Sequence, residues 1–187
     1  MSRPALFLDR DGVINEDRGY VYRVEDFFFM PGIFDLCRHA NILGMRIFVI
    51  TNQAGIGRGY YSECEFARLT EWMRRRFHEE RAPIDKVYHC PFHPEGLGRY
   101  RCESQLRKPN PGMILLAREE FCVDLQRSAL VGDKPSDVEA GRRAGVGVNI
   151  LFIGSSKAPT ELDSTVTLVR RLSDVKRLLG SAEAPLT

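Results

Sequence analysis

The stretch Ala5-Leu-Phe-Leu-Asp9-Arg-Asp11-Gly12-Val13 decides the fold and the site, because a short apolar run ends on two carboxylates one residue apart. Such a run is typical of a buried strand. Side chains alternate along an extended chain, so Asp9 and Asp11 should face the same side while Arg10 points elsewhere. Taken alone, the stretch more often marks an ordinary strand that ends in an Asp-Gly turn.

Apolar, β-branched runs recur along the chain and alternate with segments of helical period. The runs lie at 5–8, 45–50, 84–88, 129–131 and 146–153. This alternation predicts an α/β fold, in which a Rossmann-like parallel sheet carries helices on both faces in three layers. In an open parallel sheet, functional groups collect at the carboxyl ends of the strands. We therefore expect the informative residues to meet at that edge.

Four amphipathic helices are predicted between these runs. Their start and stop signals are Pro31 and Gly44 for the first, the capping pair Ser62 and Glu65 for the second, Asn110 and Pro111 for the third, and Ser136, Glu139 and Gly145 for the fourth. The charged run 74–76 near the end of the second helix is expected to be a solvated face.

The chain has 187 residues, 43% hydrophobic composition and a formal net charge of +2. This length suits one core, so we predict a single domain over 1–180 and a flexible tail over 181–187. The balanced charge argues against nucleic acid or a membrane as a partner. The first apolar run is too short for a signal or membrane-spanning segment, so we expect a cytoplasmic protein. We also expect a monomer.

The cysteines make an odd count of five and include no Cys-x-x-Cys pair. This usage favours reduced thiols over a disulfide framework and is consistent with a cytoplasmic protein. Cys37 and Cys122 lie in apolar helical patterns, so we expect both to pack as small core residues.

Polar groups follow the second run, which ends Thr51-Asn-Gln53 and leads into the glycine-rich 54–59. A hydroxyl and an amide followed by flexible backbone make a good phosphate cradle. Thr-Asn pairs also cap ordinary turns, so the pattern alone does not decide between the two interpretations.

Two further segments carry charge to the same expected edge. Lys108 stands between Arg107 and Pro109, and the proline disfavours the helical region for the lysine and holds it extended at the rim. An ordinary pair of basic residues at the surface ahead of a turn would show the same pattern, so this segment alone does not indicate a functional site. The fourth run ends on Asp133, with Asp137 four residues on, and either carboxylate could simply cap the next helix.

Four strand ends thus carry Asp-x-Asp, Thr, Lys and Asp in chain order. The ordinary structural explanation of each motif would have to hold four times independently, which explains the set poorly. The order resembles that of the four motifs of the haloacid dehalogenase (HAD) superfamily of phosphotransferases. The resemblance implies that Asp9 attacks a phosphate dianion, against a repulsion of about 4 kcal/mol per charge pair at an effective dielectric of ~20 and ~4 Å. Mg²⁺, held by Asp9, Asp133 and a main-chain oxygen at Asp11, would cancel this repulsion.

In this chemistry Lys108 and Thr51 bind the transferring oxygens. An alkoxide is a poor leaving group, so Asp11 is expected to protonate it. The same carboxylate then takes a proton from the water that hydrolyses the aspartyl-phosphate. The Asp-x-Asp spacing therefore has a mechanistic reason.

The chain also resembles one family within the superfamily, the D-glycero-D-manno-heptose-1,7-bisphosphate 7-phosphatases, which are related to histidinol-phosphate phosphatases. The segments that carry the resemblance are FLDRDGVIN (7–15), GYV (19–21), TNQAGIGRG (51–59), LTEWM (69–73), CPFHPEG (90–96), RKPNPGM (107–113) and VGDK (131–134). The resemblance implies removal of the 7-phosphate in the synthesis of ADP- or GDP-heptose precursors of surface glycans. Histidinol phosphate or another small phosphomonoester is the alternative substrate.

By the same resemblance, Asp9 is the nucleophile and Asp11 the general acid and base. The residues implied to bind substrate are Asp17, Arg18, Gly19, Tyr20, Asn52, Gln53, Ala54, Arg107 and Lys134.

The spacing also leaves no room for a large cap domain. Roughly 30 residues with one helix separate Asn15 from the second strand, and the loop 91–106 is short. We therefore expect an open site whose entrance the substrate fills. A second phosphate would be held by Arg107 or by a rim arginine such as Arg18 or Arg58, and the sequence does not choose among them.

One departure from the family pattern concerns zinc. Relatives commonly carry Cys-x-His and then Cys-x-Cys before the Arg-Lys pair, where this chain reads Cys90-Pro-Phe92 and Ser104-Gln-Leu106. Cys90, His93 and Cys102 remain as weak candidates, and three ligands at irregular spacing do not make a closed structural site. We predict a zinc-free loop held by the packing of Phe92 and the prolines.

Two other classes of function remain in competition. A non-catalytic phosphosugar-binding module would be expected to lack the nucleophile or the acid, whereas Asp9 and Asp11 are both present. A nucleic-acid 3′-phosphatase would be expected to carry an extended basic surface, which the balanced charge disfavours.

Overall fold

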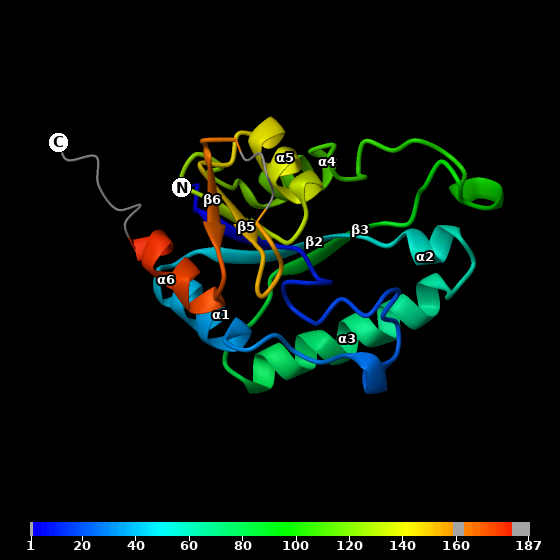
Figure 1. Ribbon diagram of the computed structural model, residues 1–187, viewed down its shortest axis with the longest axis horizontal. Helices are drawn as coiled ribbons and strands as arrows, with labels where there is room; N and C mark the ends of the chain where they lie inside the picture. The colour runs from blue at the N-terminus through cyan, green and yellow to red at the C-terminus, as the bar shows by residue number, and fades with distance from the viewer. Residues whose placement is uncertain (1, 159–162, 181–187) are drawn as a thin grey trace.

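A computed structural model describes residues 2–158 and 163–180 (Figure 1). Within these ranges the strands form one parallel sheet in the order β3-β2-β1-β4-β5-β6. The strands are β1 (Ala5–Leu8), β2 (Arg46–Asn52), β3 (Lys86–Cys90), β4 (Ala129–Gly132), β5 (Val148–Phe152) and β6 (Val166–Val169). The predicted Rossmann-like α/β architecture is confirmed. The tail predicted over 181–187 lies outside the described residues, and the single-domain boundary at 180 stays a prediction.

Helices cover both faces of the sheet. On one face lie α1 (Ile33–Ile42), α3 (Glu63–Glu79) and α6 (Leu172–Gly180), and on the other lie α4 (Gly112–Phe121) and α5 (Pro135–Ala144) (Figure 1). Alternate residues of β1 point to opposite faces of the sheet. Leu6 and Leu8 pack with the first set of helices, and Phe7 packs with the second. All of β1 is buried, which explains its unbroken apolar sequence.

The central strand β1 marks the point where the chain order of the sheet reverses. It pairs with β2 on one side and with β4 on the other. The backbone N–H of Asp9 still donates to the carbonyl of Val131 at 3.0 Å, so Asp9 stands at the carboxyl end of β1. Ligands of open α/β sheets bind at such a switch point.

The four predicted helices begin within two residues of their sequence signals, but the predicted capping pair is found only at α3 among them. Ser62 and Glu65 form the predicted capping box at the start of α3. At α5, however, Ser136 and Glu139 do not form the cap. The Asp137 carboxylate accepts from the backbone N–H of Lys134 at 3.0 Å. The capping group is therefore Asp137, the carboxylate four residues after Asp133.

The strand β6 and the helix α6 were not predicted. β6 has four residues at the sheet edge and is mostly half-buried, so its apolar signal is weak. α6 buries Leu172, Val175 and Leu179, and this apolar spacing is the signal that would have found it.

The insertions over the carboxyl edge are small. Between β1 and α1 lies the short 3-10 helix η1 (Val24–Asp26), and between β3 and α4 lies η2 (Gly98–Tyr100). Neither insertion forms a cap domain within the described ranges, as predicted. None of the described helices is both long and apolar enough to cross a bilayer.

All five cysteines are free thiols. Cys37 is buried in the core as predicted, but the prediction for Cys122 is wrong, because its side chain is exposed. Cys122 follows α4 in the left-handed conformation with φ 53°, which turns the chain out of the helical pattern that suggested burial.

Candidate active site

Asp9, Lys108 and Asp137 form a buried chain of charges at the carboxyl edge of the sheet. The Lys108 Nζ lies 2.8 Å from Oδ1 of Asp9, 2.7 Å from Oδ1 of Asp137 and 2.9 Å from the carbonyl oxygen of Ile50. These contacts use all three hydrogens of the ammonium group. Because Lys108 is only 4% exposed, the lysine and the two carboxylates depend on one another for compensation of their buried charge.

This environment shifts the pKa values of Asp9, Asp133 and Lys108. Burial raises the pKa of Asp9 to about 8, since repulsion from Asp137 and Asp133 adds to it and the attraction of Lys108 only partly opposes it. Burial likewise raises the pKa of Asp133 to about 6 against the attraction of Lys134. Burial lowers the pKa of Lys108, but Asp137 and Asp9 outweigh it and the net shift is upward. Perturbation of this kind is typical of functional sites.

The carboxylates of Asp9, Asp133 and Asp137 fit a divalent cation. One oxygen from each lies within 4.8 Å of the others. Oδ1 of Asp133 is buried without a hydrogen-bond partner, and both donors to the Asp9 carboxylate, Arg10 N and Lys108, bind Oδ1, which leaves Oδ2 without one among the described residues. Both oxygens of Asp137 already bind donors, since Oδ1 pairs with Lys108 and Oδ2 accepts from the backbone N–H of Lys134. Asp9 and Asp133 therefore carry the oxygens suited to a hard cation.

Gly12 brings the loop after β1 against Asp133. A Cβ at Gly12 would lie 2.3 Å from Oδ2 of Asp133, and the residue has φ +94°. Gly132 has a related role, because a Cβ there would meet the Cβ of Asp137 at 2.1 Å. The two glycines let the aspartates of the fourth motif pack close to the backbone.

Asp11 is held away from the three-carboxylate group by three donors. Arg10 Nη2 lies 2.9 Å from both carboxylate oxygens, Asn15 Nδ2 donates to Oδ1 at 3.0 Å and Gln53 Nε2 donates to Oδ2 at 3.1 Å. The expectation that Arg10 points away from the carboxylates was therefore wrong. Arg10 is 1% exposed, and its buried cation turns back to pair with its neighbour because burial without a counter-charge would be costly.

The end of β2 supplies the polar groups that the sequence indicated. Asn52 exchanges two hydrogen bonds with the backbone of Lys108, at 3.0 and 3.1 Å, and so fixes the lysine from the neighbouring segment. Gln53 donates to Oγ1 of Thr51 at 2.8 Å, which leaves the Thr51 hydroxyl hydrogen for another acceptor.

The glycines after Gln53 are needed mainly for close packing. Residues 54–57 form a single helical turn, α2 (Ala54–Gly57). A Cβ at Gly55 would lie 2.2 Å from the ring of Tyr61, and one at Gly57 would lie 2.4 Å from the carbonyl oxygen of Pro91. The flexible backbone expected for a phosphate cradle is therefore a tightly packed turn.

A cavity of about 500 Å³ opens over these groups. Predicted site residues that line it are Asp9, Asp11, Asp17, Gly19, Tyr20, Thr51, Asn52, Gln53, Ala54, Arg107, Lys108 and Lys134. Asp133 lines an adjoining cavity of about 510 Å³ that also includes Gly12 and Asp17. The ion pair of Lys134 with Asp17, at 3.0 Å, involves residues that line the first cavity.

Two predicted arginines lie outside these cavities. Arg18 pairs with Glu16 at 2.7 Å and its guanidinium lies 3.9 Å from the centre of the Phe28 ring. Arg58 instead pairs with Glu95 and donates to the hydroxyl of Tyr20. Of the three arginines considered for a second phosphate, Arg107 alone lines the cavity.

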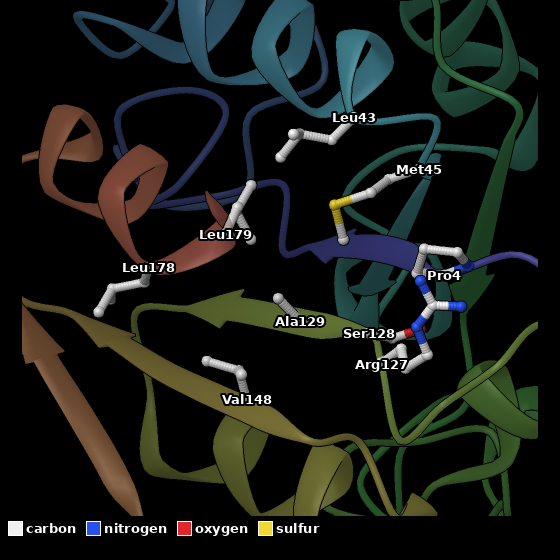
Figure 2. Close-up of a pocket in the computed structure, with 9 residues that line it drawn as sticks. All are labelled: Pro4, Leu43, Met45, Arg127, Ser128, Ala129, Val148, Leu178 and Leu179. Carbon is white, nitrogen blue, oxygen red and sulfur yellow. The ribbon is translucent and has the colours of Figure 1, made fainter. Parts of the chain in front are cut away.

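A further small cavity lies at the opposite, amino edge of the sheet (Figure 2). Its lining residues are Pro4, Leu43, Met45, Arg127, Ser128, Ala129, Val148, Leu178 and Leu179. Its volume of about 40 Å³ suits a few water molecules at most. A sugar phosphate requires the carboxyl edge.

The loop considered for zinc uses its candidate ligands in other ways. Nδ1 of His93 accepts from the backbone of Glu95 at 3.0 Å, and Nε2 lies 3.3 Å from Arg58. Cys90 is buried and Cys102 is exposed. Within the described part of the chain, the three-aspartate group is the one that meets the geometry for a metal ion. The zinc-free loop stays a prediction.

Three residues that contact this site carry no functional prediction from the sequence. The sequence indicates Asp137 only as a possible helix cap, although its spacing after Asp133 is visible. It indicates that Arg10 points away from the two aspartates. Tyr61 had no signal at all, and it donates a hydrogen bond to Oε1 of Gln53 from inside the cavity wall.

Comparisons with known proteins point to one superfamily and, within it, to one family. The HAD-hydrolase-like family model matches residues 105–172. A D-glycero-alpha-D-manno-heptose-1,7-bisphosphate 7-phosphatase of Burkholderia mallei is 60% identical over 153 residues, 81% of each chain. The D-glycero-beta-D-manno-heptose-1,7-bisphosphate 7-phosphatase of Escherichia coli K12 is 38% identical over 186 residues, 98% of this chain and 97% of that one.

Among solved structures, a D,D-heptose 1,7-bisphosphate phosphatase from B. bronchiseptica superposes with a TM-score of 0.81 at 24% identity, over 95% of this chain and 98% of that one. The fold, the family model and the phosphatase relatives together identify a hydrolase of the HAD superfamily that acts on phosphomonoesters. The identities place the chain within that class. It belongs to the D-glycero-D-manno-heptose-1,7-bisphosphate 7-phosphatase family.

Proposed function

We propose that this chain removes the 7-phosphate from D-glycero-D-manno-heptose 1,7-bisphosphate through an aspartyl-phosphate at Asp9, with Mg²⁺ as cofactor. The observation that carries the proposal is the meeting of Asp9, Lys108 and Asp133 at the switch point of the sheet, beneath an open cavity of about 500 Å³. We place the reaction in the synthesis of ADP- or GDP-heptose precursors of surface glycans, in the cytoplasm. The relatives' names support the substrate.

Asp9 Oδ2 is the attacking atom in this proposal. Lys108 and the backbone N–H of Arg10 both bind Oδ1, so the carboxylate is oriented with its other oxygen available. The Oδ2–P bond forms while the bond from phosphorus to the C7 oxygen breaks. Thr51 contributes a hydroxyl hydrogen to the transferring oxygens, and the positive charge of Lys108 reduces the repulsion between carboxylate and phosphate.

Asp11 moves the protons in both steps. It gives a proton to the departing C7 oxygen, because an alkoxide leaves slowly without one. Water then attacks phosphorus, the bond from Asp9 Oδ2 to phosphorus breaks, and Asp11 takes the proton from that water. The carboxylate that acts twice is the one that Arg10, Asn15 and Gln53 hold in place.

Mg²⁺ would be held by Asp9, Asp133 and the main chain at Asp11, where it supplies positive charge for the transferring phosphoryl group. When all three carboxyls are ionised, they and Lys108 carry a net charge of −2, which a divalent cation would balance. The B. bronchiseptica structure, whose fold this chain shares, contains magnesium and phosphate.

The sugar would enter from the rim, where the proposed binding residues lie. Asp17, Gly19 and Tyr20 line one side of the cavity, and Arg107 lines it from the segment before α4. We assign the second phosphate to Arg107, since Arg18 and Arg58 lie outside the lining. The α anomer is the first choice at C1, because the 60% identical relative is named for it and the 38% identical one for β.

Initial rates of phosphate release test the proposal, with the α and β heptose bisphosphates and histidinol phosphate compared in the presence of Mg²⁺. We expect the α heptose bisphosphate to have the highest kcat/KM, Asp9→Asn to abolish turnover of all three, and removal of the metal by a chelator to do the same. A preference for histidinol phosphate would assign the chain to the related activity. Unchanged turnover in Asp9→Asn would rule out the aspartyl-phosphate route.

A further inference from the structure

The side chain of Arg10 is among the largest that are fully buried in the protein, and it stands between the two aspartates of the first motif. Its Nε and Nη2 both reach Oδ1 of Asp11, at 3.2 and 2.9 Å, and Nη2 also lies 2.9 Å from Oδ2. Nη2 donates further to the carbonyl oxygen of Val21 at 2.6 Å. The guanidinium is thus fixed at both the carboxylate and the segment after the first motif.

The other close contacts of the Arg10 guanidinium among the described residues are with uncharged groups. The guanidinium carbon lies 5.7 Å from the centre of the Phe66 ring, and Nη1 is buried without a hydrogen-bond partner. Within the described residues, Asp11 is the one carboxylate paired with Arg10. A guanidinium stays charged in proteins, so this buried cation binds its directly paired carboxylate with a rigid fork.

A second group binds Oδ2 of the same carboxylate. The Tyr61 hydroxyl donates to Oε1 of Gln53, and Nε2 of Gln53 faces Oδ2 of Asp11 and Oγ1 of Thr51. Once Asp11 has given its proton to the leaving group, its carboxylate only accepts hydrogen bonds, so the amide nitrogen is the end of Gln53 that faces it. Tyr61 fixes this orientation because it occupies the oxygen end, and it is 5% exposed.

We propose that Arg10 and Tyr61 are positioning residues for Asp11, which set the direction of its carboxylate and thereby the enzyme's ability to expel a poor leaving group. Neither residue needs to contact phosphate. Both act through Asp11, Arg10 directly and Tyr61 by way of Gln53. The inference rests on the proposed acid role of Asp11, and it adds the two groups that give this role its geometry.

Two substrates that differ in leaving group distinguish a misdirected Asp11 from a general disruption of the active site. An alkyl phosphate needs a proton at the leaving oxygen, whereas a nitrophenyl phosphate does not, because its leaving group is already stable as an anion. The value of kcat/KM reports the steps up to the first irreversible one, which here is departure of the leaving group. A misdirected Asp11 should therefore lower kcat/KM for the alkyl ester far more than for the aryl ester.

The variants Arg10→Lys and Tyr61→Phe carry the test, with heptose bisphosphate as alkyl ester and p-nitrophenyl phosphate as aryl ester. Arg10→Lys keeps the charge and loses the fork, and we expect about a 100-fold loss on the alkyl ester and less than about 3-fold on the aryl ester. Tyr61→Phe removes one hydroxyl and leaves no charge buried without a partner. The positioning role can therefore be measured with this variant if Arg10→Lys folds poorly. We expect about a 10-fold loss on the alkyl ester from it.

Matched controls come from the same residue types away from the site. Arg46 pairs with Asp85 at 2.6 Å at the amino end of β2, and the Tyr88 hydroxyl donates to Glu120 at 2.9 Å. Arg46→Lys and Tyr88→Phe should leave the ratio of the two kcat/KM values at its wild-type level.

The outcomes distinguish the inference from the function on which it rests. Equal losses on both esters in Arg10→Lys and Tyr61→Phe, with Asp9→Asn inactive, would overturn the positioning role and leave the phosphatase mechanism standing. Turnover in Asp9→Asn would instead overturn the mechanism itself. A selective loss on the alkyl ester in either variant supports the positioning role.

Discussion

At the scale of single residues, the active site depends on buried charges that hold one another in place. Lys108 joins Asp9 to Asp137, and Arg10 is paired with Asp11, all within the carboxyl end of the sheet. Removing one partner of such a pair leaves the other charge buried and uncompensated, which costs more than the pair contributes. The residues closest to the chemistry should therefore also be important for folding.

Asp137→Asn tests this link. The amide cannot serve as the anionic partner of Lys108, so we expect kcat to fall roughly 10- to 100-fold and the free energy of unfolding to fall by about 3 kcal/mol. Chemical denaturation and steady-state kinetics measure the two effects. Glu139→Gln on the same helix is the control, because the ion pairs of Glu139 among the described residues are with surface arginines. Wild-type stability and activity in Asp137→Asn would contradict the linked-charge account.

Gly12→Ala tests the close approach of the first loop to Asp133. The added methyl group would lie 2.3 Å from Oδ2 of Asp133, so we expect weaker Mg²⁺ binding by calorimetry and a loss of about 100-fold in kcat.

Gly98→Ala is the matched control for this change. Gly98 also has a positive φ, of +50°, but a Cβ there meets nothing within 4 Å. It should share the backbone penalty of about 1 kcal/mol without the loss of metal binding. If the two variants bind Mg²⁺ equally, the contact between Gly12 and Asp133 has no functional role.

At the scale of elements, the strand ends were predictable and the links between them were not. β1 is buried on both faces, and its apolar run and terminal Asp9 are local features of the sequence. Arg10 escaped prediction because alternation along a strand no longer applies once the chain turns, and the buried cation follows its counter-charge. Cys122 escaped for a similar reason, since one left-handed residue ends the helical pattern.

The packing of β3 against α3 carries a pH-dependent contribution to stability. The His89 ring lies 4.4 Å from the ring of Phe66, and burial lowers the pKa of His89, with Arg10 adding to the shift and Glu63 opposing it. The unfolded chain then binds the proton more readily than the folded one. Stability contributed by neutral His89 is therefore lost as pH falls below the ordinary histidine range.

His89→Phe should isolate this contribution. The phenyl ring keeps the contact with Phe66 and cannot be protonated, so we expect the difference in Tm between variant and wild type to shift in favour of the variant from pH 7 to pH 5. Thermal unfolding of both proteins at the two pH values measures it. A difference that stays constant with pH would show that the histidine charge has no part in stability.

At the scale of the whole molecule, the order of the strands turns separate motifs into one site. Asp9, Thr51 and Asp133 lie far apart in the sequence, and the reversal of strand order at β1 places their strands side by side (Figure 1). Alternating periods in the sequence predict this sheet, whereas the short edge strand β6 gives too weak a signal. The reach of Tyr61 to Gln53 depends on tertiary packing alone, so no local pattern indicates it.

The most direct test of the central claim follows both phosphates of the substrate by ³¹P NMR, with the wild-type protein, Mg²⁺ and heptose 1,7-bisphosphate. The account predicts that the C7 phosphate signal disappears, that inorganic phosphate appears in equal amount, and that the C1 phosphate signal remains. Loss of the C1 phosphate, or no release of phosphate from either position, would contradict it.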